Sequence, residues 1–230
     1  MPVLALDTST DACTVALTGH PGPPYEITIP VRTGHAGSLL PVIDTLFSLS
    51  PYGMEDVDLI AVGVGPGSFT GIRIGIATAR GLSMALKRPL AGVGTLDALA
   101  CAALPCATQV MPVIDARKSE IFCRLYAPDG APLTGPMNVR PEHLADLVTT
   151  RTLFIGNAVP LYREALSAVL GGNFLEGPEH LWYPRASVIG RIAAEQAARG
   201  AIEAAQPLYV RASDAVISLQ KKNRKHNQER

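Results

Sequence analysis

The segment "VLALD", residues 3–7, followed by "CTVALT", residues 13–18, decides the fold class. An apolar run that ends in an acid is typical of a buried strand, and the second segment, after a polar turn, is typical of its hairpin partner. The hydrophobic pattern then predicts a third strand over residues 25–31, a helix over 38–49, a strand over 59–65 and a helix over 71–86. The order is therefore strand, strand, strand, helix, strand, helix.

The same order of elements recurs in the second half of the chain. "VMPVID", residues 110–115, is again an apolar strand that ends in Asp, and "EIFCRLY", residues 120–126, is again a hairpin return. After them we expect a helix over residues 141–148, a strand over 152–157, a helix over 160–170, which Gly171 and Gly172 stop, and a last helix over 187–199. Two copies of one unit predict a duplicated, two-lobed α/β fold with a shortened second lobe.

The domain boundary is expected near Pro105, which divides the chain into residues 1–105 and a smaller lobe of residues 106–219. Residues 220–230 form a polar, basic tail, which we expect to be disordered. The start of the chain lacks a basic leader, and no apolar run reaches the roughly 18 residues that a membrane span needs. We therefore expect a cytoplasmic protein that makes no contact with a membrane.

Composition argues against several classes of function. The 20 basic and 20 acidic residues give a net charge of zero, whereas a chain that binds nucleic acid with its own surface normally carries a basic excess. The histidines are isolated from one another and from cysteine, so we expect no metal site and no cofactor. The cysteines form no CxxC pair, and we expect them to be reduced, buried and inert: Cys13, Cys101, Cys106 and Cys123.

The segment "GPGSFTGIRIGIATARGL", residues 65–82, resembles a phosphate-binding loop in composition only. A Walker A loop needs a lysine, and none occurs before Lys87; the glycine spacing of a dinucleotide-binding turn is also absent. We expect instead a tight turn, a helix capped by Ser68 or Thr70, and a row of small residues that lets another backbone come close. The GxSxG turn of a serine hydrolase is missing as well, which disfavours a peptidase.

The helices predicted over residues 38–49 and 71–86 carry few charges. Either both are enclosed in the chain's own core, or they form a surface that another protein covers. The second hypothesis predicts a partner interface made of Leu39, Leu40, Ile43, Phe47, Gly71, Ile72, Gly75, Ile76, Ala79, Arg80 and Ser83.

Asp7 and Asp115 end equivalent strands of the two predicted lobes. In a duplicated fold we expect them to face one another across the cleft, where paired carboxylates hold a metal–nucleotide complex or act as acid and base. An ATP-dependent phosphotransferase that uses these two residues is therefore an alternative function. The other interpretation is that each acid only caps a turn.

Several segments together resemble the bacterial TsaB family, also called YeaZ. They are "LALDTSTDACTVAL", "GPGSFTGIRIGIATARGL", "PLAGVGTLDAL", "VIDARKSEIF" and "PLYVR", and they occur in that order along nearly the whole chain. The resemblance implies the fold of actin, Hsp70 and the sugar kinases. It also implies a role in making threonylcarbamoyladenosine, next to the anticodon of tRNAs that read ANN codons.

The family has a catalytic relative, TsaD, which carries an HxxxH histidine pair. In this chain Thr95 and Leu99 stand at the corresponding positions, and neither side chain replaces imidazole as a metal ligand. The resemblance therefore implies no catalytic residue and no enzyme activity, but a subunit that pairs with a TsaD-type protein and activates it. It further implies a TsaE-type ATPase as a partner, a homodimer when alone, and contact with tRNA through the complex.

Overall fold

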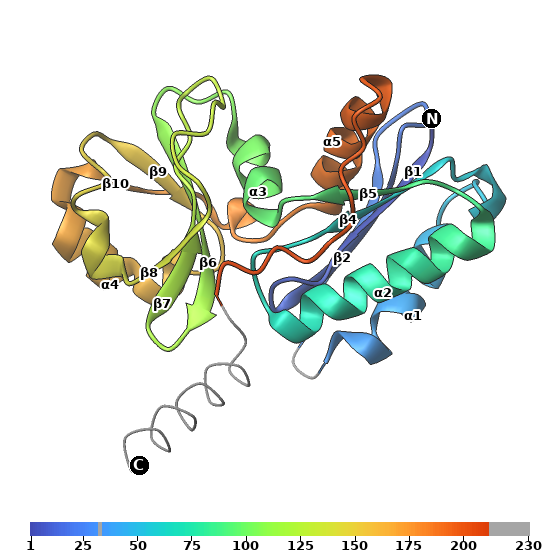
Figure 1. Cartoon of the computed structure of the whole chain (residues 1–230), viewed down its shortest axis with the longest axis horizontal. Helices are drawn as coiled ribbons and strands as arrows, with labels where there is room; N and C mark the ends of the chain where they lie inside the picture. Colours follow the sequence, from blue (N-terminus) through green and yellow to red (C-terminus); the bar gives the residue numbers. More distant parts are fainter. Residues whose placement is uncertain (32–33, 212–230) are drawn as a thin grey trace, which may run out of the picture.

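The computed structural model describes residues 1–31 and 34–211, so the predicted tail at residues 220–230 lies outside the described residues. Two lobes stand side by side, and each contains a mixed five-stranded sheet (Figure 1). The first sheet has the order β3-β2-β1-β4-β5. Its strands are β1 (Val3–Asp7), β2 (Ala12–Thr18), β3 (Tyr25–Pro30), β4 (Leu59–Gly63) and β5 (Leu90–Val93).

The second sheet repeats this topology. Read from β8 its order is β8-β7-β6-β9-β10, with antiparallel pairs on one side of β6 and parallel pairs on the other, as around β1. Its strands are β6 (Gln109–Arg117), β7 (Glu120–Cys123), β8 (Met137–Val139), β9 (Thr152–Ile155) and β10 (Phe174–Glu176). The predicted duplication and the α/β class are confirmed.

Helices cover both faces of the first sheet. Helices α1 (Leu39–Ser48) and α2 (Phe69–Leu86) lie on one face, and α5 (Ala186–Ala198) lies on the other (Figure 1). Successive residues of a strand point to opposite faces. Leu4 and Leu6 accordingly pack with α1 and α2, whereas Val3 and Ala5 pack with α5.

Helix α5 follows the second lobe in the chain but packs against the first sheet. The division into residues 1–105 and 106–219 stays a prediction. Within it, α5 belongs to the second segment by sequence but to the first lobe by packing. Between the lobes α3 (Thr95–Ala103) packs against β6. No helix in the described parts of the chain is long and apolar enough to cross a membrane.

The second lobe has less helix than the first. Where a helix over residues 141–148 was predicted, the structure has a single 3₁₀ turn, Pro141–Leu144, anchored by the buried Leu144. Helix α4 (Val159–Leu170) ends at Gly171, which has a φ of 53° and is the predicted stop. The other 3₁₀ turns are His35–Gly37, Met54–Asp56, Gly171–Asn173 and Glu179–Leu181.

Candidate functional site

Asp7, the acid at the end of β1, is fully buried. The Ser9 amide and hydroxyl each donate to Asp7 Oδ1 across 2.7 Å, and the Thr95 hydroxyl donates to Asp7 Oδ2 across 3.0 Å. Burial raises the pKa of this carboxyl group, and the hydrogen bonds from Ser9 and Thr95 partly oppose that rise. The carboxylate is therefore enclosed by the protein, with both of its oxygens engaged.

Thr95 and Leu99, which the resemblance to TsaD places at the positions of its histidines, are both buried. The Thr95 hydroxyl also accepts from the Gly65 amide across 3.2 Å, and the Thr95 amide donates to the Gly65 carbonyl across 2.8 Å. Leu99 packs in the core between α3 and the second sheet. Both positions hold the fold together, and neither presents a metal ligand.

The glycine-rich segment turns from β4 into α2, as predicted. Gly65 has a φ of 98°, which favours glycine, and Ser68 caps α2 by accepting from the Gly71 amide across 3.2 Å. A Cβ atom at Gly71 would overlap the Thr8 carbonyl oxygen, and one at Gly75 would lie 2.5 Å from Thr8 Oγ1. The small residues therefore let α2 press against the β1–β2 turn, which confirms the predicted close approach.

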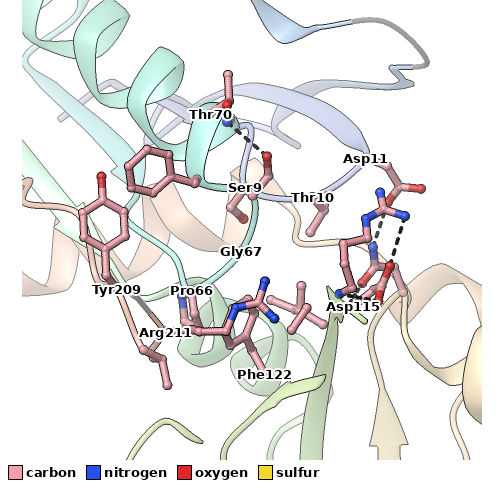
Figure 2. A pocket seen from close by; sticks show the side chains of 18 of the residues that line it. Ser9, Thr10, Asp11, Pro66, Gly67, Thr70, Asp115, Phe122, Tyr209 and Arg211 are labelled. Atoms are coloured by element: carbon pink, nitrogen blue, oxygen red, sulfur yellow. Dashed lines mark hydrogen bonds and ion pairs between the residues drawn. The ribbon is translucent and has the colours of Figure 1, made fainter. Parts of the chain in front are cut away.

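A cavity of about 370 Å³ lies between the two lobes (Figure 2). The first lobe lines it with the β1–β2 turn, including Thr10 and Asp11, and with the start of α2. The second lobe lines it with the β6–β7 turn, including Asp115, and the last described residues, including Tyr209 and Arg211, close another side. The lining is mixed, with aromatic rings beside charged groups.

Asp115, unlike Asp7, lines the cavity. Its Oδ1 accepts from the Arg117 amide across 2.8 Å and from the Tyr162 hydroxyl across 3.1 Å, and its Oδ2 lies 3.2 Å from the Arg117 guanidinium. Burial and the neighbouring Asp115 raise the pKa of Tyr162 to about 12, so its hydroxyl stays a donor at neutral pH. Asp115 thus accepts from its own turn and from α4.

The prediction that Asp7 and Asp115 face one another across the cleft is wrong. The Asp7 carboxylate is turned inward to Ser9 and Thr95, and the acid that lines the cavity from the first lobe is Asp11. Asp11 in turn accepts from the Asn157 side chain of the second lobe across 2.8 Å. These carboxylates already have partners within the chain, so they do not fit the metal–nucleotide complex that a phosphotransferase needs. Within residues 1–31 and 34–211, no cluster of three or more His, Cys, Asp or Glu side chains is placed to bind a metal ion.

Sequence reasoning missed most residues of the cavity. Thr10 and Asp11 belong to what the sequence indicates only as a polar turn, and nothing in the sequence places Arg117, at the β6–β7 turn, at a cleft. Arg211 belongs to the segment "PLYVR", which was noted only for its resemblance to the TsaB family. Its contact with the second lobe joins positions 91 residues apart, and no local pattern indicates a contact of that kind.

The predicted partner interface needs a correction. Most of its residues face the first sheet and are buried inside the chain: Leu39, Ile43, Gly71, Ile72, Gly75, Ile76 and Ala79. They lie on the inner stripes of α1 and α2, because these stripes fill the space above Leu4, Leu6 and Val62. A charge at Ile76 or Ala79 would be buried inside the first lobe, so we expect it to disrupt the folding of the lobe and not only a contact with a partner.

The remaining predicted interface residues, Leu40, Phe47, Arg80 and Ser83, are exposed or half-buried. The Arg80 guanidinium donates to the Ala205 carbonyl of this chain across 2.8 Å. Large apolar side chains outside the prediction also face solvent on these helices or just after them. Among them Met84 is 80% exposed and Leu49 66%, compared with 56% for Leu40.

A family model described as "TsaD: tRNA N6-adenosine threonylcarbamoyltransferase" matches residues 30–219. The chain is similar to the "tRNA threonylcarbamoyladenosine biosynthesis protein TsaB" of Haemophilus influenzae, with 41% identity over 124 residues. That match spans 53% of this chain and only about half, 52%, of the relative. The protein of the same name from Bacillus subtilis is 27% identical over 221 residues, which cover 94% of this chain and 96% of the relative.

Comparison with solved structures also finds a member of the TsaB (YeaZ) family. YeaZ from Pseudomonas aeruginosa is similar over 90% of this chain and 99% of its own, with a TM-score of 0.75 and 31% identity. A component of (R)-2-hydroxyglutaryl-CoA dehydratase from Acidaminococcus fermentans has a TM-score of 0.53 at 12% identity over 86% of this chain and 99% of its own, which bears on the fold alone. The expected fold class, that of actin, Hsp70 and the sugar kinases, is confirmed.

Proposed function

The chain belongs to the TsaB (YeaZ) family, and from this premise we propose that it is a non-catalytic subunit in the synthesis of threonylcarbamoyladenosine in tRNA. In this proposal it pairs with a TsaD-type transferase and activates it, a TsaE-type ATPase joins them, and tRNA is reached through the complex. Alone, the protein forms a homodimer through the surface that it uses to pair with the TsaD-type transferase. It works in the cytoplasm and needs no cofactor of its own.

The exposed apolar side chains on the outer side of α1 and α2 carry the proposal. Leu40 and Met84 project from helices whose inner stripes fill the core, and their own side chains are largely exposed to solvent. A contiguous apolar patch is typical of a surface that another protein covers, and in this proposal the exposed apolar side chains of α1 and α2 form one such patch. The proposed partner face therefore consists of Leu40, Phe47, Leu49, Ser83 and Met84.

The hydrogen bonds that engage the two strand-end acids support the same proposal. Asp7 is enclosed, Asp115 accepts from Tyr162 and its own turn, and Thr95 stands where the resemblance to TsaD places a histidine. In our proposal the chain contributes to the reaction by positioning its partner. An ATP-dependent phosphotransferase remains the alternative, and turnover of ATP by the isolated chain would favour it.

The test is reconstitution with a TsaD-type subunit. Leu40→Glu and Met84→Glu place a charge on the proposed partner face. They should weaken pairing about tenfold or more, because burial of an unpaired charge in an apolar contact costs more than the roughly 1.4 kcal/mol that corresponds to tenfold in affinity. Modification of tRNA by the complex should fall in parallel. The binding constant is measured by calorimetry, and the modified nucleoside by mass spectrometry.

Leu161→Glu is the matched control, because Leu161 is 62% exposed but lies on α4 of the second lobe. It should bind the partner as the unmodified chain does. Thermal unfolding checks that all three variants are folded. Equal pairing by Met84→Glu, Leu40→Glu and the unmodified chain would contradict the proposed face, and tRNA modification by the isolated chain would contradict the non-catalytic role.

A further inference from the structure

The last described residues, 203–211, run along the first lobe and end at the second (Figure 1). We call this segment the strap. The Gly92 amide of β5 donates to the Glu203 carbonyl across 2.9 Å, and the Leu208 amide donates to the Val64 carbonyl across 2.8 Å. Backbone hydrogen bonds thus hold the strap beside the end of the first sheet.

Helix α2 holds the strap from its exposed side. The Arg73 side chain donates from Nε to the Tyr209 hydroxyl across 2.9 Å, and its guanidinium lies 3.8 Å from the centre of the Phe69 ring. The rings of Phe69 and Tyr209 are 4.9 Å apart. The tilted pair of rings and the guanidinium over the Phe69 ring are both attractive contacts, so they hold Tyr209 at the start of α2.

Arg211 then joins the strap to the second lobe. Its guanidinium donates to Glu120 Oε2 across 2.8 Å, and both side chains are less than one-third exposed. Glu120 begins β7 and also accepts from the Asn138 side chain of β8 across 2.8 Å. The anchor on the second lobe is therefore part of a sheet, and it is not a mobile side chain alone.

The strap also forms one end of the cavity. Tyr209 and Arg211 lie at one end in Figure 2, and Asp11 and Asp115 lie at the other. At that other end the hydrogen bond from Asn157 to Asp11 crosses between the lobes. The cavity thus has a cross-link between the lobes at each end. The strap, at one end, also contacts α2 through the exposed Arg73 side chain.

We infer that the strap sets the angle between the lobes and the width of the cavity, and that it makes both respond to what happens on the outer side of α2. A change at Arg73 reaches the second lobe through Tyr209 and Arg211, because these residues follow one another within a few positions of extended chain. Loss of either anchor leaves α3 and the Asn157–Asp11 hydrogen bond in place, so the second lobe gains freedom to pivot about them and to change the width of the cavity at the strap end.

Double electron–electron resonance (DEER) spectroscopy on the full chain tests this inference. Nitroxides at Ala198→Cys on α5 and Glu164→Cys on α4 report the distance between the lobes, in a background of Cys101→Ser and Cys106→Ser; both label sites are exposed. The unmodified strap should give one narrow distance distribution. Arg211→Glu should broaden it, and Arg211→Glu combined with Glu120→Arg should restore the narrow form.

Arg73→Ala should broaden the same distribution, although Arg73 lies on the first lobe. Arg163→Glu is the control, because it breaks the ion pair with Glu176, which lies wholly within the second lobe, and it should leave the distribution narrow. Arg211→Gln serves if Arg211→Glu does not fold. A narrow, unshifted distribution in both Arg211 variants, or in Arg73→Ala, would overturn the inference, as would failure of the charge exchange to restore the narrow form.

Discussion

The Thr95 hydroxyl donates to the buried Asp7 carboxylate across 3.0 Å and joins the end of β1 to the start of α3. The same hydroxyl accepts from the Gly65 amide, so one side chain holds a strand, a helix and the turn before α2. This arrangement explains why an acid that sequence reasoning placed in a cleft instead lies inside the first lobe. Asp7 is a structural residue in this chain.

Replacement of Thr95 by valine tests that role. Thr95→Val keeps the shape but removes the donor to Asp7 and the acceptor for Gly65, and unsatisfied buried groups cost about 1–3 kcal/mol each. The free energy of unfolding in urea should fall by about that amount. Thr95→Ser keeps the hydroxyl and should lose less, and Thr45→Val, which removes an exposed helical hydrogen bond to Pro41, should change little. Equal stability of Thr95→Val and the unmodified chain would contradict the structural role.

The glycines of α2 give a graded prediction. Gly71→Ala places a methyl group against the Thr8 carbonyl oxygen, which is backbone and cannot rotate away, whereas Gly75→Ala meets the Thr8 hydroxyl. Overpacking costs about 1–3 kcal/mol, and the loss in unfolding free energy should be larger for Gly71→Ala. Gly81→Ala has no neighbour within 4 Å and should stabilise the chain by up to about 1 kcal/mol. Equal effects at the three positions would show that α2 does not press against the β1–β2 turn.

The sequence predicted the duplicated α/β fold because strand-end acids and apolar runs are local features. Local sequence features did not indicate which side of α1 and α2 faces the sheet and which faces solvent. Ile76, which faces the sheet, and Met84, which faces solvent, are both apolar, and only the position of the sheet distinguishes them. The hypothesis of an enclosed core therefore describes the inner sides of α1 and α2, and the hypothesis of a partner face stays a prediction for their outer sides.

The candidate site was harder to predict for a related reason. Asp7 and Asp115 occupy equivalent strand ends, but Ser9 and Thr95 enclose only the first. The Arg211–Glu120 ion pair depends on where the chain returns after α5, which no periodicity indicates. The strands β5 and β10 also escaped prediction, because β5 contains a glycine and β10 has only three residues.

Cysteine chemistry offers a further test. Burial, with a smaller contribution from Asp7, raises the pKa of Cys13 to about 11, and burial raises the pKa of Cys123 to about 12, so neither thiol ionises at neutral pH. The prediction that all four cysteines are buried is wrong for Cys101 and Cys106, which are half-buried. A disulfide reagent at mildly alkaline pH should therefore react with these two first. Cys13 and Cys123 should react only after unfolding. Rapid native-state reaction of a Cys101→Ser, Cys106→Ser variant would contradict this order.

The Glu120 carboxylate predicts a pH dependence of stability. Hydrogen bonds from Asn138 and Arg211 lower the pKa of Glu120 below its usual range, so its ionised form stabilises the folded chain. This contribution is complete above the ordinary carboxyl pKa and is lost as the pH falls through the lowered pKa of the folded state. Urea unfolding from about pH 3 to pH 7 should show that Glu120→Gln lowers stability at neutral pH and has a diminishing effect in acid. Glu164→Gln, on the exposed side of α4, should follow the unmodified chain throughout. A constant difference between Glu120→Gln and the unmodified chain across this range would mean that the charge on Glu120 does not hold the strap.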